Sequence, residues 1–218
     1  MKIGIIGSGA VGLTLATACI KAGHQVMVGT RDIQKKEITK WLEENPKSKG
    51  AGSFLETATF GEVIFLCTNW GGTKNALDLS GQAALKNKVV IDVTNPLDNQ
   101  GPDSEGRLSF LVGHSASGGE MVQSWLPDSR VVKALNSIGY FHMDHPVFAE
   151  GEPTMFIAGN EAEAKKIAEQ LLHQLGWNDV VDLGPIKISR EIEPLCILWC
   201  AYGFRTGTWK HAFKLLKN

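Results

Sequence analysis

Long apolar runs, an excess of charge of one sign and a low-complexity composition are all missing from this 218-residue sequence. No stretch reaches the roughly 18 uninterrupted apolar residues that a membrane-spanning helix needs. The 22 Lys and Arg residues nearly balance the 23 Asp and Glu residues, which leaves no broad positive surface for nucleic acid or an anionic membrane. A hydrophobic fraction of 43% with 21% charged residues excludes disorder, collagen and coiled coil for the whole chain. We expect a globular protein with neither a nucleic-acid nor a membrane partner.

Cysteine is scarce as well, and its spacing excludes a disulfide framework and a zinc site. The four cysteines, Cys19, Cys67, Cys196 and Cys200, lie in apolar segments, so we expect buried free thiols in a reducing compartment. Cys196 and Cys200 are one helical turn apart, but no neighbouring His or Cys completes a metal site. The first twenty residues resemble a secretory signal, yet glycines interrupt their apolar stretch. The sequence therefore favours the cytoplasm.

Short β-branched runs alternate with helical patterns along most of the chain, which is typical of a parallel sheet with crossover helices. We expect strands at residues 2–6, 25–29, 62–67, 89–93 and 131–135, with later additions at 154–158 and 179–183. We expect helices at residues 10–22, 33–44, 72–79, 119–126 and 161–175. The predicted fold class is α/β, with a doubly wound, mainly parallel sheet.

Two regions depart from this alternation. Residues 98–117 are rich in Gly, Ser, Asp and His without a sustained period, which predicts a long loop over one edge of the sheet. From Ile188 onwards the pattern is helical again, with Ser189 at the cap position and Pro194 as a kink or a first turn. We therefore expect a short C-terminal helical segment after the sheet.

A glycine-rich loop joins the first predicted strand to the first predicted helix. It matches G-x-G-x-x-G in the residues Gly7-Ser8-Gly9-Ala10-Val11-Gly12. Between a strand and a helix, this pattern predicts a site for the pyrophosphate of a dinucleotide. Gly7 permits the tight turn, Gly9 lets the backbone approach the pyrophosphate, and Gly12 lets the helix pack close to the strand. Backbone N–H groups of residues 8–11 and the helix dipole favour the negative charge. A strand-to-helix turn without a ligand is the alternative.

The end of the second predicted strand bears on the choice between NADP and NAD. An acidic residue about 20 positions into such a unit normally binds the ribose 2′-hydroxyl of NAD. Here Thr30 and Arg31 occupy that place, and Lys35 lies on the same face as Arg31 if a helix starts there. Arg31 suits a bidentate phosphate contact, Thr30 a hydrogen bond and Lys35 a point charge. We expect NADP. The alternatives are a solvated basic helix start and a ribose contact from Asp32.

Segments that contain hydroxyl and amide side chains also follow three further predicted strands. Their candidate residues are Thr68, Asn69 and Trp70, then Asn95 and Pro96, then Asn136, Ser137 and Ile138. In a doubly wound sheet, ligands lie outside the carboxyl ends of the strands. Hydroxyls and amides bind ribose and carboxamide groups, and Trp70 or Ile138 is able to cover an aromatic ring. These residues complete the candidate cofactor-binding set, with ordinary turn chemistry as the alternative at each position taken singly.

Motifs for acid–base catalysis are missing near these strand ends, including Tyr-x-x-x-Lys, a Ser-His-Asp set and paired carboxylates. Direct hydride transfer needs mostly positioning, because the cofactor carries the chemistry. His114, His142 and His145 are candidate proton donors, and His142 with His145 would need a third ligand to hold a metal ion. We therefore assign no catalytic residue and no metal site.

Four segments together carry a resemblance over nearly the whole chain: IIGSG at 5–9, VGTRD at 28–32, DVTNP at 92–96 and VKALN at 132–136. The chain resembles the NADP oxidoreductases that depend on the deazaflavin coenzyme F420, and the nucleotide-binding domain of the STEAP metalloreductases. The resemblance implies that Ser8, Thr30, Arg31 and Lys35 hold the pyrophosphate and 2′-phosphate of NADP. It also implies that residues 136–139 lie beside the nicotinamide. Residues 188–216 are more similar to the deazaflavin enzymes than to the metalloreductases.

We therefore expect a cytoplasmic NADP-dependent oxidoreductase that transfers hydride between NADPH and a deazaflavin or flavin-like small-molecule acceptor. Residues 1–184 would form the NADP-binding Rossmann domain, and residues 185–218 would contribute to the acceptor site or to a dimer contact. The apolar face of residues 196–204 suits a homodimer, with packing against its own chain as an equal alternative. Other candidate functions are an NADPH-binding sensor or interaction module without turnover, and a ferric or imine reductase.

Overall fold

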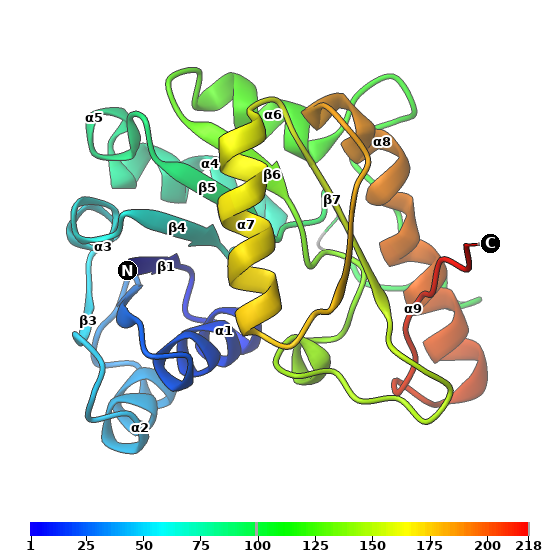
Figure 1. The fold of residues 1–218 in the computed structure, drawn as a ribbon, viewed down its shortest axis with the longest axis horizontal. Coiled ribbons are helices and arrows are strands. Elements are labelled where there is room, and N and C mark those ends of the chain that lie inside the picture. Colours follow the sequence, from blue (N-terminus) through cyan, green and yellow to red (C-terminus); the bar gives the residue numbers. More distant parts are fainter. Residues whose placement is uncertain (99, 218) are drawn as a thin grey trace.

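An eight-stranded sheet runs through the computed structural model, which describes residues 1–98 and 100–217 (Figure 1). Its order is β3-β2-β1-β4-β5-β6-β7-β8, and neighbouring strands are parallel except for β6 and β7. The strands are β1 Lys2–Ile6, β2 Gln25–Gly29, β3 Ala51–Gly52, β4 Val63–Leu66, β5 Val89–Asp92, β6 Arg130–Lys133, β7 Thr154–Gly159 and β8 Asp179–Asp182. Because the strand order reverses between β1 and β4, a crevice opens at their carboxyl ends. The predicted Rossmann-like α/β fold is confirmed.

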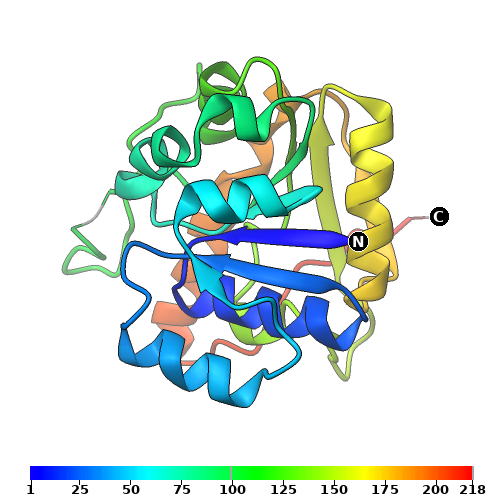
Figure 2. The same cartoon turned by 90° about the vertical axis from the view of Figure 1, so that its left-hand side faces the viewer.

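Helices cover both faces of the sheet. They are α1 Ala10–Lys21, α2 Lys36–Glu44, α3 Phe54–Phe60, α4 Trp70–Ser80, α5 Gln82–Leu85, α6 Gly118–Trp125, α7 Ala162–Gln174, α8 Ser189–Ile192 and α9 Pro194–Thr206. One apolar cluster joins Ile5 of β1 to Leu15 of α1 and Leu171 of α7. A second cluster joins Ile64 of β4 to Leu77 of α4. Figure 2 shows α1 and α2 together on one side of β1 and β2. This layering leaves the strand ends free for a ligand.

The expected strands match the structure closely, and the helix expected at residues 33–44 shows the main difference. Helix α2 begins at Lys36, so the expected start at Ile33 is wrong. The preceding segment forms a side-chain-capped turn instead: the Asp32 carboxylate accepts a hydrogen bond from the Gln34 N–H at 2.8 Å. The Thr30 hydroxyl likewise accepts one from the Asp32 N–H at 3.2 Å. These short-range bonds offer the backbone an alternative to the helix.

Among the strands and α-helices of the described residues, three were not expected from the sequence: β3, α3 and α5. Strand β3 has only two residues, too few for an apolar pattern. Helix α3 carries a recognisable signal, because the Ser53 hydroxyl accepts from the Glu56 N–H at 3.2 Å and the Glu56 carboxylate accepts from the Ser53 N–H at 2.7 Å. This reciprocal capping box corresponds to the S-x-x-E spacing in the sequence. Helix α3 brings Phe54 to the crevice.

The two regions without alternation also have defined places. Residues 98–117 form a long connection between β5 and α6, of which Asn99 lies outside the described residues. Pro194 is at the first turn of α9, as expected. After α9 the chain returns to the sheet, where the Thr154 N–H donates to the Phe213 carbonyl at 2.9 Å. The division between 1–184 and 185–218 stays a prediction, and Asn218 is outside the described residues. Across the described ranges, every helix is too short or too polar to cross a membrane.

Candidate functional site

The loop between β1 and α1 has the geometry that its glycines allow. Gly7 has a φ of +118°, and a Cβ atom there would lie 2.6 Å from the Cys67 carbonyl oxygen. A Cβ atom on Gly12 would collide with the Gly7 carbonyl, which shows how closely α1 packs on the loop. At Gly9, by contrast, a Cβ atom would meet nothing within 4 Å. The loop therefore needs glycine for packing at Gly7 and Gly12, while Gly9 faces open space.

A cavity of about 720 Å³ lies at the carboxyl ends of β1, β2 and β4. Its lining combines the glycine loop, the end of β2, one residue of α3 and the first turns of α4: Gly7, Ser8, Gly9, Thr30, Arg31, Asp32, Lys35, Phe54, Cys67, Thr68, Asn69, Gly71, Gly72, Asn75 and Ala76. Of the expected glycine-loop set, Ala10, Val11 and Gly12 belong to α1 and do not line the cavity. The structure thus brings the loop and the basic end of β2 to one site.

Hydroxyl groups connect the glycine loop to the end of β2. The Ser8 hydroxyl donates to the Thr30 hydroxyl at 3.0 Å, and the Thr30 hydroxyl donates to the Asp32 carbonyl at 3.1 Å. Thr30 is buried, whereas Arg31 is exposed at the mouth of the cavity. Lys35 precedes α2 and its backbone is not helical, so the expected shared helical face with Arg31 is wrong, yet both side chains line the cavity. The site therefore presents two cations beside a preorganised hydroxyl pair.

The end of β4 contributes a second hydroxyl pair. The Thr68 and Thr73 hydroxyls are 2.8 Å apart, and the Thr73 hydroxyl donates to the Asn69 carbonyl at 3.1 Å. Cys67 also reaches the cavity, but burial raises the pKa of its thiol well above the ordinary value, so it is a neutral group rather than a nucleophile. The sequence argument missed this residue and the α4 residues that follow Trp70 and line the cavity. The Gly71-Gly72 pair shortly after the end of β4 was the available signal.

Trp70 has a different place from the one expected. It begins α4 and stacks on Trp125, with ring centroids 5.5 Å apart and planes inclined by 29°. A Cβ atom on Gly118 would lie 3.1 Å from the Trp70 ring. Trp70 therefore packs α4 against α6 and does not line the cavity. Its assignment to the cofactor-binding set stays a prediction that the packing does not favour.

The remaining candidates form a separate group at the ends of β5 and β6, outside the lining of the large cavity. The Asn95 amide donates to the Asn136 carbonyl at 2.8 Å, and the Asn136 amide donates to the Asn95 side-chain oxygen at 3.1 Å. Pro96, Ser137 and Ile138 are buried next to them in the chain. The candidate set thus divides into two groups, one at each half of the doubly wound sheet. This division matches the two mononucleotide-binding halves of such a fold.

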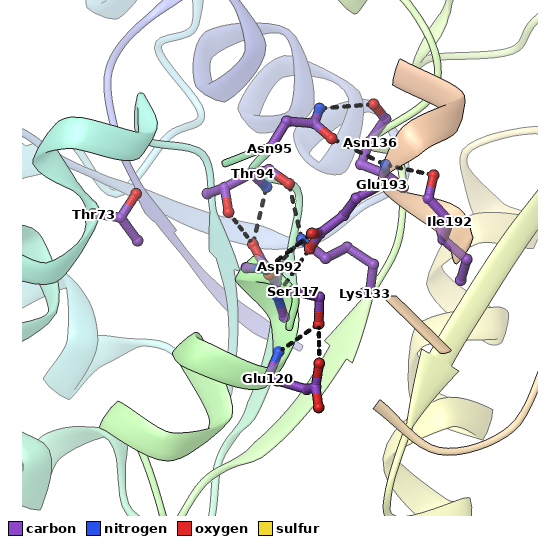
Figure 3. Close-up of polar contacts among 12 residues, drawn as sticks. Thr73, Asp92, Thr94, Asn95, Ser117, Glu120, Lys133, Asn136, Ile192 and Glu193 are labelled. Atoms are coloured by element: carbon purple, nitrogen blue, oxygen red, sulfur yellow. Dashed lines mark hydrogen bonds and ion pairs between the residues drawn. The ribbon is translucent and has the colours of Figure 1, made fainter. Parts of the chain in front are cut away.

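A buried charged cluster lies beneath this second group (Figure 3). The Lys133 ammonium is 2.7 Å from the Asp92 carboxylate and 2.8 Å from the Glu193 carboxylate, and it donates to the Thr94 carbonyl at 2.8 Å. Although burial lowers the pKa of Lys133, the Asp92 and Glu193 carboxylates raise it above its ordinary value. Lys133 is therefore a buried ammonium ion. The signal was a charged residue at the end of each of two apolar strands, VVID and RVVK.

The histidines and cysteines form no metal centre in the described part of the chain, where groups of three or more metal-ligating side chains do not occur. The His142 ring packs against Phe141 and Phe148, and His145 pairs with the adjacent Asp144 carboxylate at 2.7 Å. Burial, Lys210 and His211 lower the pKa of His142. All four cysteines are free thiols. Neither histidine lines the large cavity.

Comparison with known proteins adds an independent line of evidence. The sequence profile of the family described as NADP oxidoreductase, coenzyme F420-dependent, matches residues 2–96. The chain is 31% identical over 207 residues to the F420-dependent NADP reductase of Methanothermobacter marburgensis, with 89% of each chain covered. It is also 30% identical over 203 residues to metalloreductase STEAP3 of Rattus norvegicus, which covers 89% of this chain but only 36% of that relative.

A solved structure shows the same likeness in three dimensions. The crystal structure of a protein from Arthrobacter sp. FB24, provisionally assigned as an F420-dependent NADP reductase, matches with a TM-score of 0.92. The two sequences are 32% identical, and the match covers 100% of both chains. The similarity therefore extends over the sheet, the long connection and the C-terminal helices alike.

Proposed function

This chain belongs to the family of coenzyme F420-dependent NADP oxidoreductases, and we propose that it transfers hydride between NADPH and a deazaflavin or flavin-like acceptor. The family expected from the sequence is confirmed, and with it the class of NADP-dependent oxidoreductase. The hydride step and the residues that carry it are the proposal. It is supported by the cavity in which Arg31 and Lys35 face the glycine loop.

The cavity has the shape and charge that NADP requires. Open space at Gly9 leaves room for a pyrophosphate against the loop, and the N-terminus of α1 favours its negative charge. Arg31 and Lys35 are placed at the end of β2, where a ribose 2′-phosphate would lie. The guanidinium suits bidentate phosphate binding. We propose that Ser8 and Thr30 orient this end of the cofactor through their shared hydrogen bond.

The contacts of Asp32 support NADP over NAD. This carboxylate is the one acidic side chain that lines the cavity in the described structure. One of its oxygens accepts a hydrogen bond from the Gln34 N–H at 2.8 Å, which directs it to its own turn. That hydrogen bond uses part of the acceptor capacity of the carboxylate. The balance of charge at the 2′-position is therefore positive.

The chemistry of the step places few demands on the protein. Bound NADPH supplies the hydride from its nicotinamide ring. Direct transfer to a flavin-like ring needs the two rings in contact, so the chain's contribution is binding, orientation and exclusion of water. We propose that Thr68 and Asn69 contact the central part of the cofactor. Asn95, Asn136 and residues 137–138 would line the nicotinamide end. No protein acid or base takes part in this scheme.

A second cavity supports a role for the C-terminal segment in acceptor binding. It measures about 450 Å³ and lies between the long connection and α9. Its lining is mostly apolar and includes Phe110, Val112, Ile197 and Leu198, with Arg190 among its polar residues. An apolar slot of this kind suits a flat aromatic ring system. We propose that residues 185–218 contribute to the acceptor site here.

Helix α9 also supports the proposed homodimer. One side packs on its own chain through Cys196 and Trp199, which are buried. The other side exposes Leu198, Tyr202 and Phe204, with 57%, 50% and 41% of their surface accessible. An exposed apolar strip is typical of an interface between copies. Light scattering would show a dimer, and Tyr202→Asp, at an exposed residue that does not line the acceptor cavity, would return it to the monomer. The free cysteines agree with a reducing cytoplasm, which we propose as its compartment.

The function is tested by mixing the purified protein with NADPH and one acceptor at a time under anaerobic conditions. The acceptors are oxidised coenzyme F420, FMN and a ferric chelate, and absorbance is followed at the nicotinamide and acceptor bands. We expect rapid NADPH oxidation with the deazaflavin. The similarity to a metalloreductase makes the ferric chelate the second candidate. Saturable NADPH binding without oxidation by any acceptor would instead favour the sensor without turnover.

A further inference from the structure

A closed ring of hydrogen bonds, completed by one ion pair, joins three segments that are distant in the sequence. Starting from Lys133, the ring passes to the Thr94 carbonyl and along the chain to Asn95. It continues through the paired amides of Asn95 and Asn136 (Figure 3). The Asn136 amide also donates to the Ile192 carbonyl at 3.3 Å. Ile192 precedes Glu193, whose carboxylate returns to Lys133 at 2.8 Å. The ring thereby fixes the positions of the end of β5, the end of β6 and the C-terminal helices relative to one another.

The ammonium of the ring, Lys133, and the two carboxylates that pair with it are almost completely buried, and one of the Asp92 oxygens has the ion pair with Lys133 as its sole polar contact in the described structure. Lys133 and Asp92 have 0% of their side chains exposed and Glu193 has 3%, so water does not compete for them. The Glu193 carboxylate also accepts from the Gly118 and Gly119 N–H groups at 2.9 and 2.8 Å. These donors belong to the first turn of α6, where the helix dipole helps to offset the second negative charge.

Such a cluster is not explained by stability alone. Desolvation of three charges opposes folding, and well-packed apolar residues of similar volume commonly stabilise a core as well or better. Fixed ammonium and carboxylate geometry instead restricts the relative positions of the groups that it joins. The ring meets the candidate binding set at Asn95 and Asn136, and the side-chain oxygen of Asn136 is buried without a partner. The paired amides therefore retain acceptor capacity.

The position of the ring in the sheet indicates what it would hold in place. The cavity with Arg31 and Lys35 lies at the ends of β1, β2 and β4. The ring lies at the ends of β5 and β6, in the other mononucleotide-binding half, where the nicotinamide nucleotide of a dinucleotide lies. None of the ring residues lines the cavity that would take the 2′-phosphate. Separate sets of residues thus lie where the two ends of the cofactor would bind.

We propose that Lys133 and Glu193 are positioning residues that set the nicotinamide end of NADPH against the acceptor side of the crevice. They act through Asn95 and Asn136 and not by contact with the reacting atoms. The inference rests on the proposed function in that it takes NADPH in the orientation described above. Because Glu193 also lines the apolar cavity beside α9, the same ring fixes that wall relative to the strand ends. The ring would thereby fix the distance across which hydride moves.

Fragment binding tests this role independently of turnover. The fragment 2′,5′-ADP contains the 2′-phosphate end of the cofactor and lacks nicotinamide. For Glu193→Gln, which keeps the side-chain shape, we expect an unchanged dissociation constant for 2′,5′-ADP and about tenfold weaker binding of NADPH. We expect the single-turnover rate of hydride transfer to fall by about 10- to 100-fold, because small misplacements of reacting groups have large effects. Equal weakening of both ligands, or no change in either, would overturn the proposal.

Two further variants control for general loosening of the C-terminal helices. Glu120 on α6 binds Arg190 on α8 through two hydrogen bonds of 2.7 Å, so Glu120→Gln weakens a contact between the same helices outside the ring. We expect Glu120→Gln to leave the ratio of NADPH to 2′,5′-ADP affinity unchanged. If Glu120→Gln weakened NADPH binding selectively, as expected for Glu193→Gln, the positioning role would be refuted. Should Glu193→Gln not fold, Asp92→Asn weakens the contact to the same ammonium from its other side, at a residue outside the candidate binding set, and the difference between NADPH and 2′,5′-ADP binding must appear there. A wild-type protein that binds both ligands but reduces no acceptor would contradict the proposed function. The ratio of NADPH to 2′,5′-ADP affinity in the variants would still test the positioning role of the ring.

Discussion

The Ser8 hydroxyl donates a hydrogen bond to the Thr30 hydroxyl at 3.0 Å, and this contact joins the glycine loop to the end of the neighbouring strand. It places the group that would bind the pyrophosphate next to the segment that would bind the 2′-phosphate. Arg31 follows immediately and is exposed, so its guanidinium is free to approach a ligand without disturbing the fold. Cofactor preference is therefore separable from stability at this site.

Arg31→Ala should weaken the binding of NADPH about 10- to 100-fold, since charge-assisted hydrogen bonds contribute about 1.5–3 kcal/mol. NADH has no 2′-phosphate, so its affinity should change by less than about twofold. Lys36→Ala is the matched control because it removes a nearby positive charge from a residue that does not line the cavity. Isothermal titration calorimetry with NADPH and with NADH measures the dissociation constants of each variant. Equal losses for NADPH and NADH would contradict the assignment of Arg31 to the 2′-phosphate.

Two glycines of the same loop should respond in opposite ways to alanine. Gly9→Ala adds a methyl group in open space, so the free energy of unfolding should change by no more than about 0.5 kcal/mol. NADPH binding should weaken, because the methyl group would occupy space that the pyrophosphate needs. Gly12→Ala forces a methyl group against the Gly7 carbonyl and should destabilise the fold by about 1–3 kcal/mol. Denaturant unfolding and NADPH titration of both variants separate the two effects. A stable Gly12→Ala protein would refute the close-packing argument.

Lys133→Met should be far more damaging to the fold than a surface substitution. It leaves the Asp92 and Glu193 carboxylates buried without their shared cation, and breaking a buried pair costs about 3–5 kcal/mol. Urea unfolding at pH 7 measures the decrease in the free energy of unfolding relative to the wild type. Lys165→Met is the control, because Lys165 pairs with an Asp182 carboxylate that is 47% exposed and should cost about 1 kcal/mol or less. Similar losses for the two variants would show that the buried cluster contributes little.

The Glu120 and Arg190 pair should make stability depend on pH in the acid range. Hydrogen bonds from Arg190 and Ser117 lower the pKa of Glu120 below its ordinary value of 4.5. A carboxyl group with a lowered folded-state pKa contributes stability above its unfolded pKa and loses it as the pH falls through the folded value. The free energy of unfolding of the wild type should therefore exceed that of Glu120→Gln at pH 6, and the difference should vanish below that folded pKa. A difference independent of pH would mean that the charge of Glu120 has no part in it.

The first part of the fold was predictable because its signals are local. The run Lys2–Ile6, the G-x-G-x-x-G loop and helix Ala10–Lys21 follow one another without interruption. Strand β3 was not predictable, because two residues carry no period and pair only through their neighbour β2. The start of α2 was missed for the opposite reason: the side chains of Thr30 and Asp32 form short-range bonds that compete with the helical pattern.

Sequence alone determined the α/β class, the glycine loop and the cationic residues at the end of the second strand, since each depends on residues close together in the chain. Only the tertiary structure decided that Trp70 packs on Trp125, that Lys35 reaches the cavity without a helix, and that Asp92, Lys133 and Glu193 meet. Those contacts join residues far apart in the chain, and their partners are selected by how the sheet and its helices pack.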